Sequence, residues 1–123
     1  MKKLPTNFYI FFFMSFGWFF LIFYSLFHYT PDSSLYVFKY FDKIIHFVLF
    51  FIQTLLILIT LLLYGSNLNS KFILSITLFI SLFALSTEIY QSILPLRKFD
   101  FFDFLTDVFG IVIALFYIKY FYK

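Results

Sequence analysis

Residues 8–27 have the sequence FYIFFFMSFGWFFLIFYSLF, twenty residues in a row without one charged side chain. A helix needs about 20 mostly apolar residues to cross the hydrocarbon core of a membrane. Three more runs of this kind follow at 44–64, 72–94 and 101–118. None of them alternates polar and apolar residues, as the strands of a membrane barrel do. The sequence therefore predicts an all-α fold, an integral membrane bundle of four transmembrane helices.

The composition also indicates that lipid is the solvent of this chain. Of the 123 residues, 63% are hydrophobic, 28% are aromatic and 12% are charged. Soluble proteins carry about 25% charged residues. Because the chain has no cysteine, disulfides and thiolate metal sites are excluded. The net charge of +3 comes from cations scattered at the ends of the apolar runs, so we expect no nucleic-acid partner.

Turn-forming residues separate the four runs, at 28–33, 65–70 and 95–100. We expect a single domain over residues 1–123. The first run is longer than the apolar core of a signal peptide, about 7–15 residues, which favours a retained helix. Five Lys and Arg residues fall on the side of the termini and four on the other side. Since the first helix usually dominates orientation, we expect cytoplasmic termini in a bacterial cytoplasmic membrane.

Polar residues gather at one end of the expected bundle. The loops after the first and third helices face the same compartment, which brings together the start of the second helix, the end of the third and the start of the fourth. That end holds Asp42, Lys43, His46, Glu88, Gln91, Arg97, Asp100, Asp103 and Asp107. The opposite loop offers only Asn67, Asn69 and Lys71. This one-sided distribution indicates a functional site.

Helical spacing places several of these residues on shared faces. Residues three or four apart lie on one side of a helix, as Asp42 and His46 do. The fourth helix carries a stripe of carboxylates and small residues, and small residues let membrane helices approach closely. The stripe consists of Asp103, Asp107, Gly110 and Ala114.

Ionisable side chains inside a membrane span are rare and costly, and they usually have partners. His46, Glu88 and Asp107 are of this kind. A purely structural explanation remains open, in which Lys43 or Arg97 bridges Glu88 and Asp103. Asp100 could serve only as a helix cap.

The order of these residues resembles the VanZ-like family of small bacterial membrane proteins. The resemblance is carried by DKIIHF at 42–47, EIYQ at 88–91, RKFDFFD at 97–103 and Gly110, and it covers roughly residues 42–114. The family commonly has Asn at the position of Asp107 and often Gly at that of Ala114. One member is linked to low-level resistance to the glycopeptide teicoplanin. The resemblance implies a membrane fold and a polar site more firmly than it implies a reaction.

We expect a binding protein of the cell envelope, with membrane lipids and a lipid-linked or glycopeptide ligand as partners. Arg97 and Lys43 would take an anionic group, while Glu88, Asp103 and Gln91 would orient them. The full set of expected ligand-binding residues is Asp42, Lys43, His46, Glu88, Gln91, Arg97, Asp103 and Asp107.

Two other functions remain open. In an intramembrane enzyme acting on a lipid precursor, the catalytic candidates are His46, Glu88 and Asp103, with His46 as general base. A metal held by His46, Glu88, Asp103 and Asp107 is conceivable, but the chain lacks a compact motif of two histidines, so we expect no metal and no other cofactor. Ion transport ranks last because four helices would require an oligomer.

Overall fold

A computed structural model describes residues 3–28, 40–95 and 97–122 of the chain. The described residues form four helices and no strand. These are α1 (Thr6–His28), α2 (Phe41–Tyr64), α3 (Ser70–Ile93) and α4 (Phe101–Phe121). The predicted all-α fold is confirmed, and the largest differences from the predicted bounds are three residues, at the start of α2 and the end of α4. Beyond His28, the predicted loop at 28–33 lies outside the described residues.

The short connection between α2 and α3 is shaped by the caps of both helices. Gly65 adopts a left-handed conformation with φ 89°, and its N–H returns to the carbonyls that end α2. A glycine reaches this conformation without the steric cost that a side chain brings. The Asn69 side chain then accepts a hydrogen bond from the Phe72 N–H at 2.9 Å. The chain therefore reverses direction between α2 and α3 as the sequence predicts, although α3 packs against α4 rather than forming a closely packed hairpin with α2.

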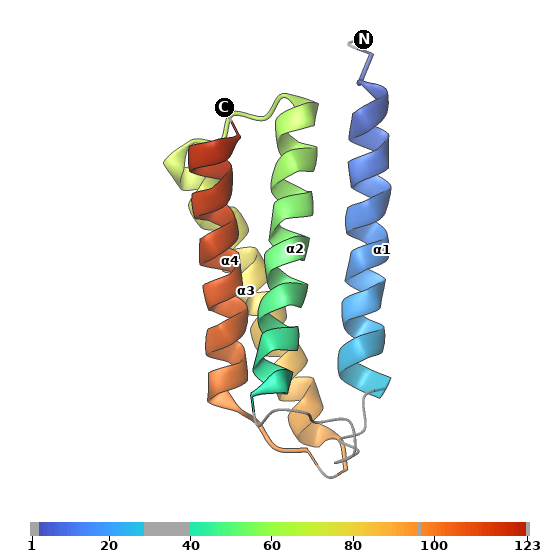
Figure 1. Cartoon of the computed structure of the whole chain (residues 1–123), viewed down its shortest axis with the longest axis vertical. Helices are drawn as coiled ribbons and strands as arrows, with labels where there is room; N and C mark the ends of the chain where they lie inside the picture. Colours follow the sequence, from blue (N-terminus) through green and yellow to red (C-terminus); the bar gives the residue numbers. More distant parts are fainter. Residues whose placement is uncertain (1–2, 29–39, 96, 123) are drawn as a thin grey trace.

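Each of the four helices is long and apolar enough to cross a membrane. Large apolar side chains cover their outer faces, and Phe79 is 72% exposed. In water such a surface would be unfavourable, whereas lipid solvates it. The chain is therefore a multi-pass membrane protein. Figure 1 shows α2 between α1 and α4, with α3 crossing behind them and both termini at one end.

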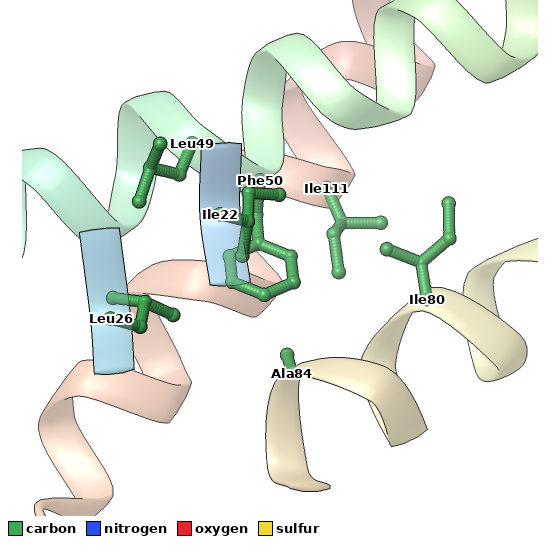
Figure 2. Close-up of a cluster of buried hydrophobic side chains, with 7 residues drawn as sticks. All are labelled: Ile22, Leu26, Leu49, Phe50, Ile80, Ala84 and Ile111. Carbon is green, nitrogen blue, oxygen red and sulfur yellow. The ribbon is translucent and has the colours of Figure 1, made fainter. Parts of the chain in front are cut away.

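The core of the bundle receives side chains from all four helices (Figure 2). It consists of Ile22, Leu26, Leu49, Phe50, Ile80, Ala84 and Ile111. Lipid is as apolar as these residues, so close packing rather than removal from solvent holds such helices together. The core lies in the interior of the bundle and leaves the end away from the termini to polar side chains.

The closest approach in the bundle is between α2 and α4. A Cβ atom added to Gly110 would lie 2.6 Å from the carbonyl oxygen of Phe47. The predicted stripe on α4 faces inward, because Asp103, Asp107, Gly110 and Ala114 are all buried. Glycine is therefore the residue that lets these two helices meet.

Among the described residues, side-chain hydrogen bonds that cross between helices help to attach α1 to its neighbours. The Trp18 indole donates to the Leu49 carbonyl at 2.9 Å. The Gln53 amide donates to the Ser15 hydroxyl at 3.0 Å, and a third bond comes from Gln91 of α3, described below. These bonds are distributed along α1 and hold it against α2 and α3.

Candidate functional site

The start of α2, the end of α3 and the start of α4 lie at the same end of the bundle, opposite the termini (Figure 1). The prediction that the polar residues share one end is confirmed. Four ionisable residues among them are almost completely buried: His46 and Glu88 are 1% exposed, Asp103 is 5% exposed and Asp107 is 0% exposed. Asp107 lies six residues into α4, which corresponds to a depth of about 9 Å at the rise of an α-helix.

The deepest part of the site is formed by His46, Glu88 and Asp107, which we call the inner cluster. His46 Nδ1 lies 2.9 Å from Asp107 Oδ1, a hydrogen-bond distance. Glu88 Oε1 lies 3.6 Å from the same nitrogen, which is too far for a hydrogen bond. One carboxylate from α3 and one from α4 thus approach the same ring nitrogen of His46 on α2.

Nearer the surface, Lys43 holds two carboxylates, and we call Lys43, Asp100 and Asp103 the outer cluster. Lys43 Nζ donates to Asp103 Oδ1 at 2.7 Å and to Asp100 Oδ2 at 3.0 Å. The hypothesis that Lys43 bridges Glu88 and Asp103 is therefore wrong in its first partner, because the start of α4 brings Asp100 to Lys43. Asp103 Oδ2 also lies 3.9 Å from His46 Nε2 and links the two clusters.

Asp100 caps α4 while it pairs with Lys43. Its Oδ1 accepts a hydrogen bond from the Phe102 N–H at 2.8 Å, so the predicted cap is confirmed. Partial burial favours the neutral acid and is the largest single influence, but the hydrogen bond and charge of Lys43 together with the backbone N–H groups of Phe102 and Asp103 lower the pKa of Asp100 below its ordinary value. Near neutral pH, Asp100 is therefore ionised in the folded protein.

The inner cluster, unlike the outer one, is not mutually satisfied. Within the described residues, His46 Nε2, Glu88 Oε1 and Asp107 Oδ2 are buried and have no hydrogen-bond partner. A buried polar group left unpaired costs about 1–3 kcal/mol. Mutual neutralisation accounts for Lys43, Asp100 and Asp103, but it does not account for the inner cluster.

The other predicted site residues take different places. The Gln91 amide donates to the Leu26 carbonyl at 3.0 Å, so this side chain ties α1 to α3. Arg97 is half-buried in the loop before α4. Asp42 lies in the first turn of α2, near His46 and Asp103.

The four residues expected around a conceivable metal fall, together with Asp42, into two overlapping groups. Within the part of the chain that is described, His46, Glu88 and Asp107 form one group, and Asp42, His46 and Asp103 form the other. In each group, the candidate ligand atoms lie within 4.8 Å of one another. The shared helical face predicts Asp42 beside His46, whereas the hydrogen-bond partner of His46 in the structure is Asp107. The available signal in the sequence was the one-turn spacing of Asp103 and Asp107, which places both carboxylates on one face of α4.

No family model, no curated protein and no solved structure matches this chain. The resemblance to the VanZ-like family therefore remains a prediction from the order of the motifs. Chemically, the site combines a salt-bridged outer layer with an inner layer of unpaired acceptors around one imidazole. Such a layer can accept hydrogen bonds from a ligand, orient a general base or coordinate a cation.

Replacing Lys43 by methionine should destabilise the bundle by up to about 3 kcal/mol, because breaking a buried pair leaves an uncompensated carboxylate. Asp103, whose side chain is 8% exposed, would be that carboxylate. Unfolding by SDS in mixed micelles measures the change in free energy. Asp100→Asn is the matched control and should cost less than about 1 kcal/mol, since the Asp100 side chain is 44% exposed.

The Asp100 control also has a predicted pH dependence. Because the pKa of Asp100 is lowered in the folded state, its stabilising contribution is present above the ordinary carboxyl pKa of about 3.9. That contribution is lost as the pH falls through the folded pKa. The wild type and Asp100→Asn should therefore differ at neutral pH and converge in acid. A difference that grows in acid would contradict the assigned ion pair.

Proposed function

We propose that this protein binds the hydroxyl-bearing or amine-bearing headgroup of a lipid or lipid-linked ligand in the bacterial cell envelope. One observation carries the proposal: three buried atoms of His46, Glu88 and Asp107 lack a hydrogen-bond partner among the described residues. They lie about 9 Å below the start of α4, at a depth that a headgroup or the first part of a lipid chain can reach.

The chemistry of the site favours a ligand that donates hydrogen bonds. Ionised carboxylates only accept, so Glu88 and Asp107 suit the O–H groups of a sugar or the N–H groups of an amine. The charge of Lys43 is already paired with Asp100 and Asp103. Lys43 would therefore shape the entrance, while Arg97, in the loop at the same end, would take a phosphate of the headgroup.

The resemblance to VanZ-like proteins adds one specific ligand. Teicoplanin is an amphiphile that carries sugars and an acyl chain, so it presents hydroxyl donors at a membrane surface. Protection from such a molecule would fit a site that accepts hydroxyl groups at the end of a membrane bundle. This specific link rests on the resemblance alone.

Purified protein in lipid nanodiscs should bind a polyprenyl-phosphate-linked sugar more tightly than phosphatidylcholine. Glu88→Gln and Asp107→Asn should each weaken binding of that sugar lipid about 10-fold or more, which corresponds to about 1.4 kcal/mol. Teicoplanin is tested as a second probe under the same conditions. The matched control is Lys119→Gln, which removes a charge at the opposite end of α4 and should leave binding unchanged. Equal binding by the wild type, Glu88→Gln and Arg97→Ala would reject the proposed site.

An intramembrane enzyme acting on the same class of ligand is the second candidate. The specific observation is the buried His46–Asp107 pair at 2.9 Å, since an imidazole oriented by a carboxylate is a common general base. Mass spectrometry of the ligand recovered from the binding assay separates the two candidates. Recovery of unchanged ligand supports a binding protein, whereas turnover that is lost in His46→Gln assigns the catalytic role.

A further inference from the structure

The inner cluster leaves a charge problem that hydrogen bonds do not solve. Glu88 and Asp107 are both carboxylates, and their side chains are 1% and 0% exposed. Burying a carboxylate is costly unless it is protonated, paired or coordinated to a metal. Lys43 contacts the outer carboxylates, and one imidazolium at His46 would supply a single positive charge for two negative ones. A divalent cation would balance both carboxylates and contact all three side chains at once.

We propose that His46 Nδ1, Glu88 Oε1 and a carboxylate oxygen of Asp107 form a binding site for a divalent transition-metal ion. Nδ1 lies 2.9 Å from Asp107 Oδ1 and 3.6 Å from Glu88 Oε1. Ligands held about 2.1 Å from a tetrahedral ion lie about 3.4 Å apart, so the observed spacings bracket the required one. The unpaired Glu88 Oε1 and Asp107 Oδ2 are the atoms that the proposed function offers to a hydroxyl group, and with an ion bound to them that hydroxyl would reach the ion instead.

The surroundings of His46 also suit a metal ligand. A metal-bound histidine usually donates its other ring N–H to a carboxylate, which fixes the ring. With the ion on Nδ1, the ring proton would reside on Nε2, and Asp103 Oδ2 lies 3.9 Å away, which is longer than a hydrogen bond. Lys43 in turn holds Asp103 at 2.7 Å. The outer cluster would position the inner one if the bound ion turns the His46 ring toward Asp103.

The alternative group of Asp42, His46 and Asp103 fits less well. Asp103 is already bound to Lys43, and Asp42 is only half-buried, whereas every member of the inner cluster is buried. One imidazole with two carboxylates favours first-row transition ions over Mg²⁺ and Ca²⁺, which prefer oxygen alone. Three protein ligands leave a fourth position open. A hydroxyl oxygen of the ligand proposed above could fill that position, although the metal site does not depend on that ligand.

Titration with Co²⁺ tests the site without any lipid ligand. Protein in detergent is first dialysed against a chelator, and Co²⁺ is then followed by its visible absorption, with Zn²⁺ as the competitor. We expect saturation at one ion per chain and displacement by Zn²⁺. Glu88→Gln and Asp107→Asn should weaken Co²⁺ binding more than about 10-fold, and Asp103→Asn should weaken it about 10–100-fold, as loss of a supporting carboxylate does.

Asp42→Asn is the control that separates the two groups, and it should bind Co²⁺ as the wild type does. Zn²⁺ should also raise the unfolding midpoint of the wild type and not that of Glu88→Gln, because an ion stabilises only the state that binds it. The absence of saturable binding by the wild type would overturn the proposal. So would loss of binding in Asp42→Asn with retention in Glu88→Gln. Repeating the sugar-lipid assay with chelator shows whether lipid binding stands without the ion.

Discussion

Replacing Gly110 by alanine is expected to destabilise the bundle by about 1–3 kcal/mol, the usual cost of overpacking a close contact. The added Cβ would lie 2.6 Å from the Phe47 carbonyl oxygen and 3.1 Å from the Phe51 nitrogen. Both are backbone atoms of α2, so no flexible side chain can move aside. α2 and α4 must separate instead. Unfolding by SDS in mixed micelles measures the loss.

The same substitution should also weaken the inner cluster, since His46 and Phe47 are neighbours on α2 and Asp107 precedes Gly110 by one turn. Separation of the helices would lengthen the 2.9 Å contact between His46 and Asp107. The matched control is Gly17→Ala in α1, where an added Cβ meets nothing within 4 Å. Gly17→Ala should be neutral or stabilising, because alanine favours a helix more than glycine does. Equal stability of the two variants would show that the approach at Gly110 is not tight.

The sequence was sufficient to predict the helices and the end of the bundle at which the polar residues meet. Apolar runs of spanning length specify the four helices, and an alternating topology brings three helix ends together whichever way the protein faces. The start of α2 was placed at residue 44, whereas the helix begins at Phe41. The predicted apolar run began just after Asp42 and Lys43, and the structure includes both in the first turn of α2. An acidic residue is favourable in the first turn of a helix, and Lys43 gains two carboxylate partners there.

The partners within the site could not be predicted in the same way. Whether His46 meets Asp42, Glu88 or Asp107 depends on the rotation and spacing of α2, α3 and α4, which helical periodicity leaves free. The close approach at Gly110 selects Asp107. Gln91 was assigned to the ligand site because of its spacing from Glu88, but its amide reaches the Leu26 carbonyl. The position of α1 decides that contact, and no pattern in the sequence fixes it.

Unpaired atoms are also invisible in a sequence, because only distances reveal them. The predicted cluster contained charges of both signs, so partial mutual neutralisation was a possible explanation for it. In the structure, the one lysine in the site serves Asp100 and Asp103, and the inner acceptors are left over. This division into a satisfied and an unsatisfied layer is what favours a ligand over a purely structural role.

Removing the inner cluster as a whole should not lower the free energy of unfolding, whereas removing Lys43 should lower it. In a combined His46→Leu, Glu88→Met and Asp107→Leu variant, apolar side chains would replace the three groups that carry unpaired buried atoms. Exchanging a buried polar group for well-packed apolar residues is often neutral or stabilising by about 1–4 kcal/mol. The same variant should lose binding of the sugar lipid and of Co²⁺. The combination of retained stability with lost binding would assign the cluster to the ligand.

The central claim is that the inner cluster is retained for a ligand at a cost in stability. Its most direct test is the free energy of unfolding of this triple variant, measured beside the wild type in SDS mixed micelles with chelator and without lipid ligand. We predict that the variant is as stable as the wild type or more stable. A clear loss of stability, with Gly17→Ala unchanged in the same assay, would contradict the claim and assign the cluster to holding the helices together.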